Sequence, residues 1–247
     1  MLQEERHNFI VQQIHAHHKV VASELSHKLK VSLDTVRRDI KALEKRGKVI
    51  KVHGGAVSSN FHQPFQPQEV YARQEKKEIA KKTLTLIKDG MTLLTGGGTV
   101  MIELARMLPE HLTGTFFTVS PLVALEAAQR SSVEVILLGG RLSRNSYICT
   151  GASVASEIAE LRVDLCLLGT NGLSLKEGIT DYDWEVAQVK KAILNASDRT
   201  ALLCISEKLD TTQKIQVSNL NAIDYLITEL NSNHEKLESY RNRCKVM

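Results

Sequence analysis

The chain has 247 residues, which allows one small and one average-sized domain. With 43% hydrophobic and 24% charged residues, it has the composition of a globular protein with a hydrophobic core. Its start is polar and mixed in charge, and no apolar run approaches the ~20 residues of a membrane-spanning helix. We therefore expect no signal peptide, no membrane segment and a cytoplasmic location.

The basic charge is concentrated in the first quarter of the chain. Residues 1–57 hold eleven Lys and Arg against six Asp and Glu, together with six of the nine His. The remaining residues hold 21 basic and 22 acidic side chains. A small basic module on a neutral body is typical of a nucleic-acid-binding protein, although charge alone equally fits an ordinary basic surface.

The four cysteines, Cys149, Cys166, Cys204 and Cys244, are far apart and form no Cys-x-x-Cys pair. This spacing argues against a zinc site and against a disulfide framework. We expect reduced thiols, three of them in or near the core and Cys244 in a polar tail. Nothing in the sequence indicates a metal ion or a cofactor.

Two short helices are predicted before the main motif of the N-terminal region. Phe9, Ile10 and Ile14, with Leu2 as a further candidate, lie at helical spacing and give the first helix an apolar face. After an extended link, Ser23 is the expected N-cap of the second helix. A tight turn at Lys30-Val31 then leads into a third helix.

The third helix, predicted from Ser32 to Arg46, carries the strongest pattern in the sequence. Apolar residues at three- and four-residue spacing give it a core-facing stripe: Leu33, Val36, Ile40 and Leu43. Polar and basic residues remain for its outer faces: Thr35, Arg37, Arg38, Lys41 and Lys45. A helix, a tight turn and a second helix with a basic outer face indicate a helix-turn-helix, whose second helix enters the DNA major groove.

A β-hairpin is predicted next, because residues 48–57 alternate in polarity around Gly54-Gly55. Its position is that of the wing in a winged helix-turn-helix. Lys48, Lys51 and His53 would then lie near the phosphate backbone or the minor groove.

The residues Val31-Ser32-Leu33-Asp34-Thr35-Val36-Arg37-Arg38-Asp39-Ile40, followed by His53-Gly54-Gly55-Ala56, resemble the signature of the DeoR family of bacterial repressors. The resemblance implies that the third helix binds operator DNA. The candidate DNA-binding residues are Ser32, Thr35, Arg37, Arg38, Lys41, Lys51 and His53.

The chemistry of these side chains suggests their roles. Arginine can pair bidentately with guanine, and Ser or Thr can bind phosphates or base edges. Arg37 and Arg38 point about 100° apart on a helix, so they cannot contact bases equally well. One of them is expected to contact a phosphate or to form a salt bridge with Asp34 or Asp39.

We expect a winged helix-turn-helix domain at residues 1–57, a linker at 58–68 and an α/β domain at 69–247. The linker segment contains two prolines and no charged residue. A charged helix is expected from about residue 69 to 88. Apolar runs that predict buried strands then lie at 91–94, 115–119, 133–138, 163–168, 201–205 and 225–228. Helical stretches alternate with them at 100–108, 122–130, 153–161 and 183–196, which favours a largely parallel sheet.

Ligands of such sheets bind beyond the carboxyl ends of the strands, where this chain has several candidate residues. Gly96, Gly97, Gly98 and Thr99 join a strand to a helix and could bind an anion at the helix N-terminus, or form a purely structural turn. The other strand ends contribute Ser120, Arg141 and Lys208. The two cations suit an acidic ligand, although either could be an ordinary surface charge.

This arrangement extends the resemblance over nearly the whole chain. It is similar to the DeoR effector domain, which is related to ribose-5-phosphate isomerase and typically binds phosphorylated sugars. A repressor of a carbohydrate-catabolism operon is implied, with a phosphorylated sugar as effector. Gly96, Val100, Val119 and Ile205 depart from the usual polar residues of the family, so the pocket is expected to differ in what it binds.

Two other functions remain open. The large domain could be an active isomerase, but residues 166–172, where the isomerases carry catalytic acids, contain no carboxylate. Of the acids downstream, one could line the pocket: Glu177, Asp181, Asp183 or Glu185. The protein could also bind DNA without an effector. We expect a non-enzymatic regulator that acts as a homodimer or homotetramer, because two half-sites are needed for useful affinity.

Overall fold

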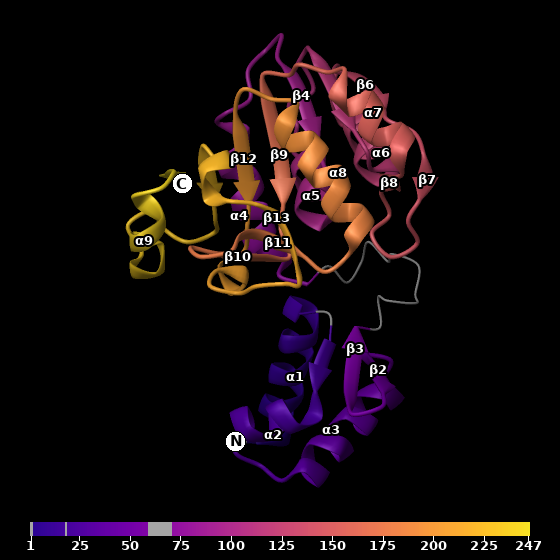
Figure 1. The fold of residues 1–247 in the computed structure, drawn as a ribbon, viewed down its shortest axis with the longest axis vertical. Helices are drawn as coiled ribbons and strands as arrows, with labels where there is room; N and C mark the ends of the chain where they lie inside the picture. Colours follow the sequence, from indigo (N-terminus) through magenta and orange to yellow (C-terminus); the bar gives the residue numbers. More distant parts are fainter. Residues whose placement is uncertain (1, 18, 59–70) are drawn as a thin grey trace. The chain divides into compact units, whose positions relative to one another are not determined.

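The computed structural model describes residues 2–17, 19–58 and 71–247 (Figure 1). They divide into two compact units, Met1–Tyr71 and Ala72–Met247. Most of the predicted linker, residues 59–68, lies outside the described residues, and Ser58 ends a strand of the first unit. In the described part of the chain, no helix has the length and apolar character needed to cross a membrane.

The small unit is a three-helix bundle with a three-stranded antiparallel sheet. Its elements are α1 (Gln3–His17), β1 (Lys19–Val21), α2 (Ala22–Leu29), α3 (Leu33–Lys45), β2 (Val49–Val52) and β3 (Gly55–Ser58). Strand β3 lies between β1 and β2. The apolar stripes of the helices meet in one core, in which Ile10, Val36 and Ile40 are at most 1% exposed. The predicted winged helix-turn-helix is confirmed.

Local signals set the ends of α3. The Ser32 hydroxyl accepts a hydrogen bond from the Thr35 amide at 3.2 Å, as expected for an N-cap. Gly47, with φ of +69°, follows the helix and allows the chain to turn back. The predicted cap of α2 at Ser23 is wrong, because α2 begins at Ala22. The Ala22 amide is satisfied instead by the Gly54 carbonyl of the hairpin turn, at 2.8 Å.

The large unit contains a seven-stranded parallel sheet in the order β15-β14-β12-β9-β4-β5-β6. Its strands are β4 (Thr92–Thr95), β5 (Thr115–Thr118), β6 (Glu134–Leu137), β9 (Leu165–Gly169), β12 (Thr200–Leu203), β14 (Tyr225–Ile227) and β15 (Lys245–Val246). The six predicted strands are confirmed to within two residues at each end. Strand β9 lies at the centre, and residues 165–168 are fully buried, as expected for a strand covered on both faces.

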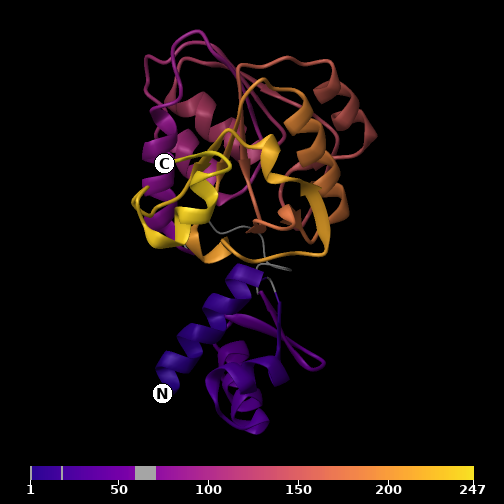
Figure 2. The same cartoon turned by 60° about the vertical axis from the view of Figure 1, so that its left-hand side comes forward.

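Helices cover both faces of this sheet. They are α4 (Arg73–Leu84), α5 (Thr99–Arg106), α6 (Pro121–Arg130), α7 (Ala152–Ala159), α8 (Trp184–Asn195) and α9 (Glu238–Arg241). Helices α4, α5 and α6 pack side by side on one face, and α7 and α8 lie on the other (Figures 1 and 2). The α/β fold class is therefore confirmed. The charged helix is shorter than expected, since α4 ends at Leu84.

Several short elements at the edge of the large unit were not predicted. A hairpin consists of β7 (Arg141–Leu142) and β8 (Cys149–Thr150). A small antiparallel sheet contains β10 (Gly172–Ser174), β11 (Gly178–Asp181) and β13 (Ile215–Ser218). Short 3₁₀ turns occur at Ser206–Lys208, Leu220–Ala222 and Glu235–Leu237. The small sheet follows directly from the carboxyl end of β9, so it adds residues where a ligand of a parallel sheet is expected.

Three of the cysteines, Cys149, Cys166 and Cys204, are buried, as predicted. Cys244 does not lie in a free polar tail. It packs against the core of the large unit, directly before β15. Burial raises the pKa of Cys166 and Cys204 to about 12, which keeps both thiols protonated and unreactive.

Candidate functional site

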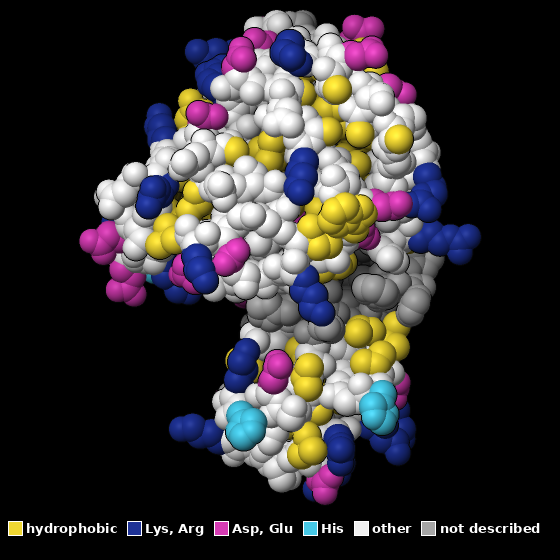
Figure 3. All heavy atoms as spheres, viewed as in Figure 1, with side chains coloured by type: hydrophobic (Ala, Val, Ile, Leu, Met, Phe, Trp, Pro, Cys, Tyr) yellow, Lys and Arg dark blue, Asp and Glu magenta, His cyan; other side chains and the backbone are white. Residues whose placement is uncertain are grey.

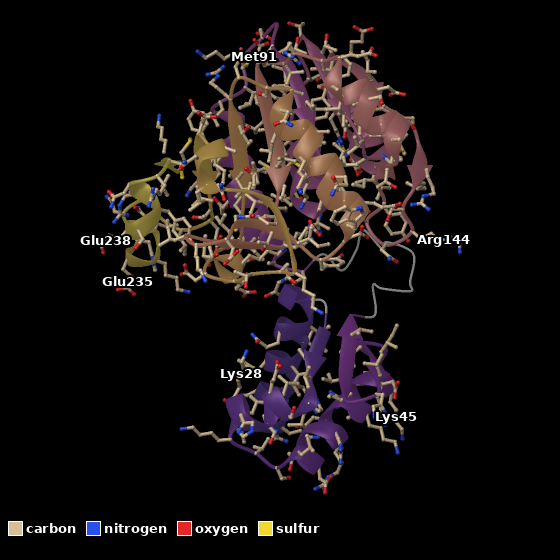
Figure 4. The ribbon with its side chains drawn as sticks, in the orientation of Figure 1. Lys28, Lys45, Met91, Arg144, Glu235 and Glu238 are labelled. Carbon is tan, nitrogen blue, oxygen red and sulfur yellow. The ribbon has the colours of Figure 1, made fainter. Side chains whose placement is uncertain are left out.

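The first candidate site is the outer face of α3. Ser32, Arg37, Arg38 and Lys41 are exposed, and Thr35 is half-buried beside Ser32. On the visible face of the small unit, Lys, Arg and His side chains predominate over acidic ones (Figure 3). The same basic character extends to the helix ends at Lys28 and Lys45, which are labelled in Figure 4.

Arg37 and Arg38 both interact with Asp34 but in different ways. Arg37 Nη1 lies 3.4 Å from the Asp34 carboxylate, in an exposed ion pair. Arg38 Nε donates instead to the backbone carbonyl of Asp34, also at 3.4 Å. The expected salt bridge with Asp34 therefore involves Arg37.

Asp39 is not part of the exposed face. Its side chain is 3% exposed and binds Arg6 Nε at 2.8 Å and His7 Nε2 at 3.1 Å. Because Arg6 and His7 belong to α1, this carboxylate fixes α3 against α1. In the sequence Asp39 follows two arginines, and nothing there indicates its partners 33 and 32 residues earlier, Arg6 and His7.

The hairpin β2–β3 has the geometry of a wing. Gly54 has φ of +81°, which favours glycine, and a Cβ atom on Gly55 would lie 1.9 Å from the Val20 carbonyl oxygen. Lys51 and His53 are exposed at the tip and on the outer strand. The Lys51 amide donates to the Glu44 carboxylate at 3.1 Å, so the wing is tied to the last turns of α3.

The second candidate site lies at the carboxyl ends of β4, β5, β9 and β12. The loop Gly96–Gly98 leads into α5, whose N-cap residue Gly98 has no side chain to cap the helix amides. A Cβ atom on Gly97 would lie 2.1 Å from Ile148 and 3.4 Å from Ser120 Cβ, so the loop and Ser120 are neighbours. Gly97 O lies 3.9 Å from the position of a Cβ atom on Gly169, the last residue of β9.

Ser120 and Arg141 have structural partners. Ser120 Oγ accepts from the Val123 amide at 3.5 Å and caps α6. Arg141 forms an ion pair with Glu185, and its side chain is 68% exposed. Glu185 also accepts from Thr150 Oγ1 at 3.2 Å. Arg141 lies on the β7–β8 hairpin, and its ion pair with Glu185 links this hairpin to the first turn of α8.

Lys208 lies at the carboxyl end of β12. Its Nζ donates to the Thr170 carbonyl at 2.8 Å and to Asn171 Oδ1 at 3.3 Å. Burial lowers the pKa of Lys208 to about 8. Burial, together with the charge of Lys208, lowers the pKa of Lys76 on α4 to about 7. Two half-buried lysines with lowered pKa values, one of them at the carboxyl end of β12, therefore interact electrostatically in this part of the large unit.

Lys76 was not among the predicted site residues. It lies in a strongly charged helix, Arg73–Leu84, and nothing in that run of charges distinguishes Lys76 from the other lysines of the helix. The first residue of the same helix, Arg73, binds Glu103 on α5 with Nε and Oε1 3.3 Å apart. Glu103 is 2% exposed and also binds Arg106 at 3.0 Å, so the start of α4 is fixed by a buried carboxylate.

The acids downstream of β9, whose roles the sequence left open, differ in their contacts. Asp183 caps α8 by accepting from the Glu185 and Val186 amides at 2.9 and 3.2 Å. Asp181 is fully buried and binds Lys190 at 2.7 Å and the Asn171 amide at 3.2 Å. Asp181 is thus the carboxylate that reaches the end of β9. The described residues contain no cluster of His, Cys, Asp and Glu that could hold a metal ion.

At Val100, Val119 and Ile205, where the sequence departs from the usual polar residues of the family, the carboxyl ends of the strands carry apolar side chains. They are 8%, 0% and 5% exposed, so each belongs to the core rather than to a polar surface. These three positions therefore offer no polar side-chain group to a ligand at this end of the sheet.

Comparison with known proteins decides the family. The family model of the DeoR C-terminal sensor domain matches residues 72–230, and that of the DeoR-like helix-turn-helix domain matches residues 6–61. The chain belongs to the DeoR family. The resemblance seen in the sequence is confirmed, and the protein is a DNA-binding transcriptional regulator with a sensor domain.

Relatives of this DeoR-family protein match it over nearly their whole length. The transcriptional regulator GolR of Listeria innocua is 30% identical over 91% of this chain and 90% of its own. The transcriptional repressor GlcR of Bacillus subtilis is 31% identical over 93% and 89%. Among solved structures, ribose 5-phosphate isomerase A of Methanocaldococcus jannaschii has a TM-score of 0.40 at 19% identity, covering 54% of this chain and 53% of its own.

Proposed function

We propose that this protein represses a carbohydrate-catabolism operon by binding its operator through α3, and that a phosphorylated sugar or a related phosphorylated metabolite controls this binding. The observation that carries the proposal is the exposed basic face of α3, which lies on a helix anchored by a buried ion pair. The name of a relative in Escherichia coli, the glycerol-3-phosphate regulon repressor, supports the effector class; it is 26% identical over 93% of this chain.

On DNA, the N-terminal half of α3 enters the major groove. Arg38 is proposed to contact a base, since it is exposed and its contact with Asp34 uses Nε rather than an Nη atom. Arg37 and Lys41 contact phosphates, and Ser32 and Thr35 bind phosphates or base edges near the helix start. Lys51 and His53 bring the wing to the adjacent backbone.

The effector is proposed to bind between the glycine loop and the two coupled lysines. Gly96, Gly97, Gly98 and Thr99 offer backbone amides at the start of α5, next to Ser120. Lys208 supplies the charge, and Lys76 is added to the predicted set. Arg141, on the β7–β8 hairpin, is proposed to bind the ligand after its ion pair with Glu185 breaks.

Sensing rather than catalysis is supported by the state of Asp181. Burial opposes its charge, but the Lys190 ammonium and several hydrogen bonds hold the pKa of Asp181 below its ordinary value. A carboxylate with a low pKa is a weak general base at neutral pH. An isomerase assay with aldose and ketose phosphates is therefore expected to give no turnover.

The protein is proposed to act as a homo-oligomer, because one winged helix buries too small a site for tight operator binding. The contacts are expected from the large unit. Large apolar side chains there are exposed to solvent, namely Leu125, Leu137, Leu142, Leu175 and Trp184.

The test begins with selection of the operator from random duplex DNA by the full-length protein. Operator affinity is then measured with and without each of a set of sugar and polyol phosphates. One of these compounds should weaken operator binding, and by linkage the operator should weaken its binding by the same factor. Equal effector affinity with and without operator would reject the proposed control, and failure to select any DNA sequence would reject operator binding.

A further inference from the structure

A buried polar cluster stands directly behind Lys208. Lys190 Nζ binds Asp181 Oδ2 at 2.7 Å, and Asn171 Nδ2 lies 3.2 Å from each Asp181 oxygen. The other end of the same amide, Asn171 Oδ1, accepts from Lys208 Nζ at 3.3 Å. Asp181 is 0% exposed and Lys190 is 9% exposed, so the ion pair at the inner end of this chain of contacts is shielded from water, while Asn171 and Lys208 are half-buried.

Asp181 is held as an ionised acceptor. Besides Lys190 and Asn171, its Oδ1 accepts from the backbone amides of Tyr182 and Asp183 at 2.8 and 3.1 Å. The donors surround the carboxylate from β11, α8 and the end of β9. A fully buried carboxylate with these donors is stable only in its charged form.

The ionised carboxylate fixes which way the Asn171 amide points. Because a carboxylate can only accept hydrogen bonds, the NH₂ group of Asn171 must face Asp181. The amide oxygen then faces Lys208. We propose that Asp181 and Lys190 are positioning residues that orient the Asn171 amide and thereby hold the Lys208 ammonium at the anion site. The inference rests on the proposed role of Lys208 in effector binding.

The arrangement also sets how many contacts Lys208 can offer a ligand. Within the described residues, its acceptors are the Thr170 carbonyl and Asn171 Oδ1. An ammonium has three donors, so one remains for an anion. If the Asn171 amide turned over, its NH₂ group would face the ammonium instead, which would push Lys208 from its position and disfavour its charge.

The test uses full-length protein and sulfate, whose charge stays constant between pH 6 and 9, as the probe anion. Asp181→Asn places an amide opposite Asn171 and removes the requirement for its present orientation. Calorimetric sulfate affinity should fall by about tenfold to 100-fold, the size expected for a lost hydrogen bond to a charged group. Operator affinity without ligand should stay as in the wild type.

A second readout separates positioning from simple loss of structure. Because both Lys76 and Lys208 titrate in this range, the decline of sulfate affinity with pH is followed in the Lys76→Arg background, where Lys208 is the lysine of the pair that still titrates. In that background the decline should move to lower pH when Asp181→Asn is added, because Lys208 loses an acceptor. The double variant Asp181→Asn/Lys190→Met removes both buried charges together and should also lower sulfate affinity, because the Asn171 amide again loses the carboxylate that orients it; it replaces the single variant if that one does not fold. Lys88→Ala, an exposed lysine beyond the opposite end of β4 near Met91 (Figure 4), is the matched control and should leave affinity unchanged.

Wild-type sulfate affinity and an unchanged pH profile in folded Asp181→Asn and Asn171→Ala would overturn the positioning role. Failure of the proposed effector site gives a different result, since Lys208→Ala would then bind sulfate as tightly as the wild type. Loss of binding in Lys208→Ala together with the shifted profile in Asp181→Asn supports the proposal.

Discussion

Neighbouring arginines on α3 are held differently, although both lie within one turn of Asp34. The Arg37 guanidinium pairs with an exposed carboxylate, while Arg38 is anchored through Nε to a backbone oxygen. An exposed guanidinium that is anchored through Nε can use its Nη groups for bidentate pairing with guanine. The two side chains are therefore expected to contribute differently to sequence specificity.

Replacing Arg38 by alanine should weaken operator binding by about 1–3 kcal/mol and affect random DNA much less. Arg37→Ala, its matched control, should weaken both by a similar amount and reduce the salt dependence of binding. Fluorescence anisotropy on operator and random duplexes measures both effects. An equal loss on the two duplexes for Arg38→Ala would make Arg38 a phosphate contact.

Anion binding at the lysine pair should be linked to proton uptake. The pKa of Lys76 is about 7 and that of Lys208 about 8, chiefly because both are buried. Nearby carboxylates, Glu75, Glu103 and Glu207 around Lys76, oppose this shift only in part. Above pH 7 the free site loses protons, and a bound anion favours their return. Sulfate affinity should therefore fall as the pH rises from 7 to 9.

Calorimetry in buffers with different protonation enthalpies measures this uptake directly. Lys76→Arg keeps its charge over the whole range, so proton uptake near pH 7 should be lost in this variant while anion binding is retained. A pH-independent sulfate affinity in the wild type would show that Lys76 and Lys208 do not serve the anion.

At the scale of elements, what could be predicted depended on length and periodicity. Helix α3 and the strands of the parallel sheet have strong apolar patterns, and their positions were predictable. The cap of α2 was not, since its first amide is satisfied by the distant Gly54 carbonyl. The small sheet β10-β11-β13 was missed because its strands have only three or four residues. The role of Asp181 could not be predicted from the sequence, because its contact with Lys190 depends on the packing of α8 against β11.

The link between α1 and α3 is expected to be essential for the small unit. Replacing Asp39 by alanine leaves Arg6 and His7 without their shared carboxylate in a mostly buried position. The melting temperature of the small unit should fall by about 5 °C or more, while the large unit melts as in the wild type. Circular dichroism and calorimetry of the full chain test this, with exposed Asp34→Ala as the control. Unchanged melting of the small unit would mean that the apolar core alone fixes α3.

At the scale of the whole molecule, strand–helix alternation predicted a parallel sheet but not its strand order. The site depends on that order, because β9 lies between β4 and β12 and so brings Gly169–Asn171 next to both the glycine loop and Lys208. The glycines, Ser120 and Lys208 could thus be selected from the sequence as strand-end residues. Lys76 could not, since α4 reaches the site only through packing of the helical layer.

Self-association should be visible through the single tryptophan of the chain. Trp184 is 64% exposed on the large unit, and exposed aromatic residues are frequent anchors of protein interfaces. Its fluorescence should shift to shorter wavelength as the protein concentration rises, and Trp184→Glu should sediment as a smaller species. Lys88→Glu, at an exposed polar position of the same unit, serves as the control. Unchanged sedimentation of Trp184→Glu would place the oligomer contact on a different surface.

The first turn of α4 links anion binding in the sensor domain to movement of a helix. Arg73, fixed by the buried carboxylate of Glu103, and Lys76, coupled to Lys208, stand three residues apart on one stiff helical turn. In the sequence, this turn is also where the chain from the DNA-binding unit enters the first helix of the sensor. An anion that attracts the Lys76 ammonium therefore displaces the first turn of α4, and the Arg73–Glu103 ion pair resists this displacement. The strength of the Arg73–Glu103 ion pair should therefore decide how far α4 moves when an anion binds.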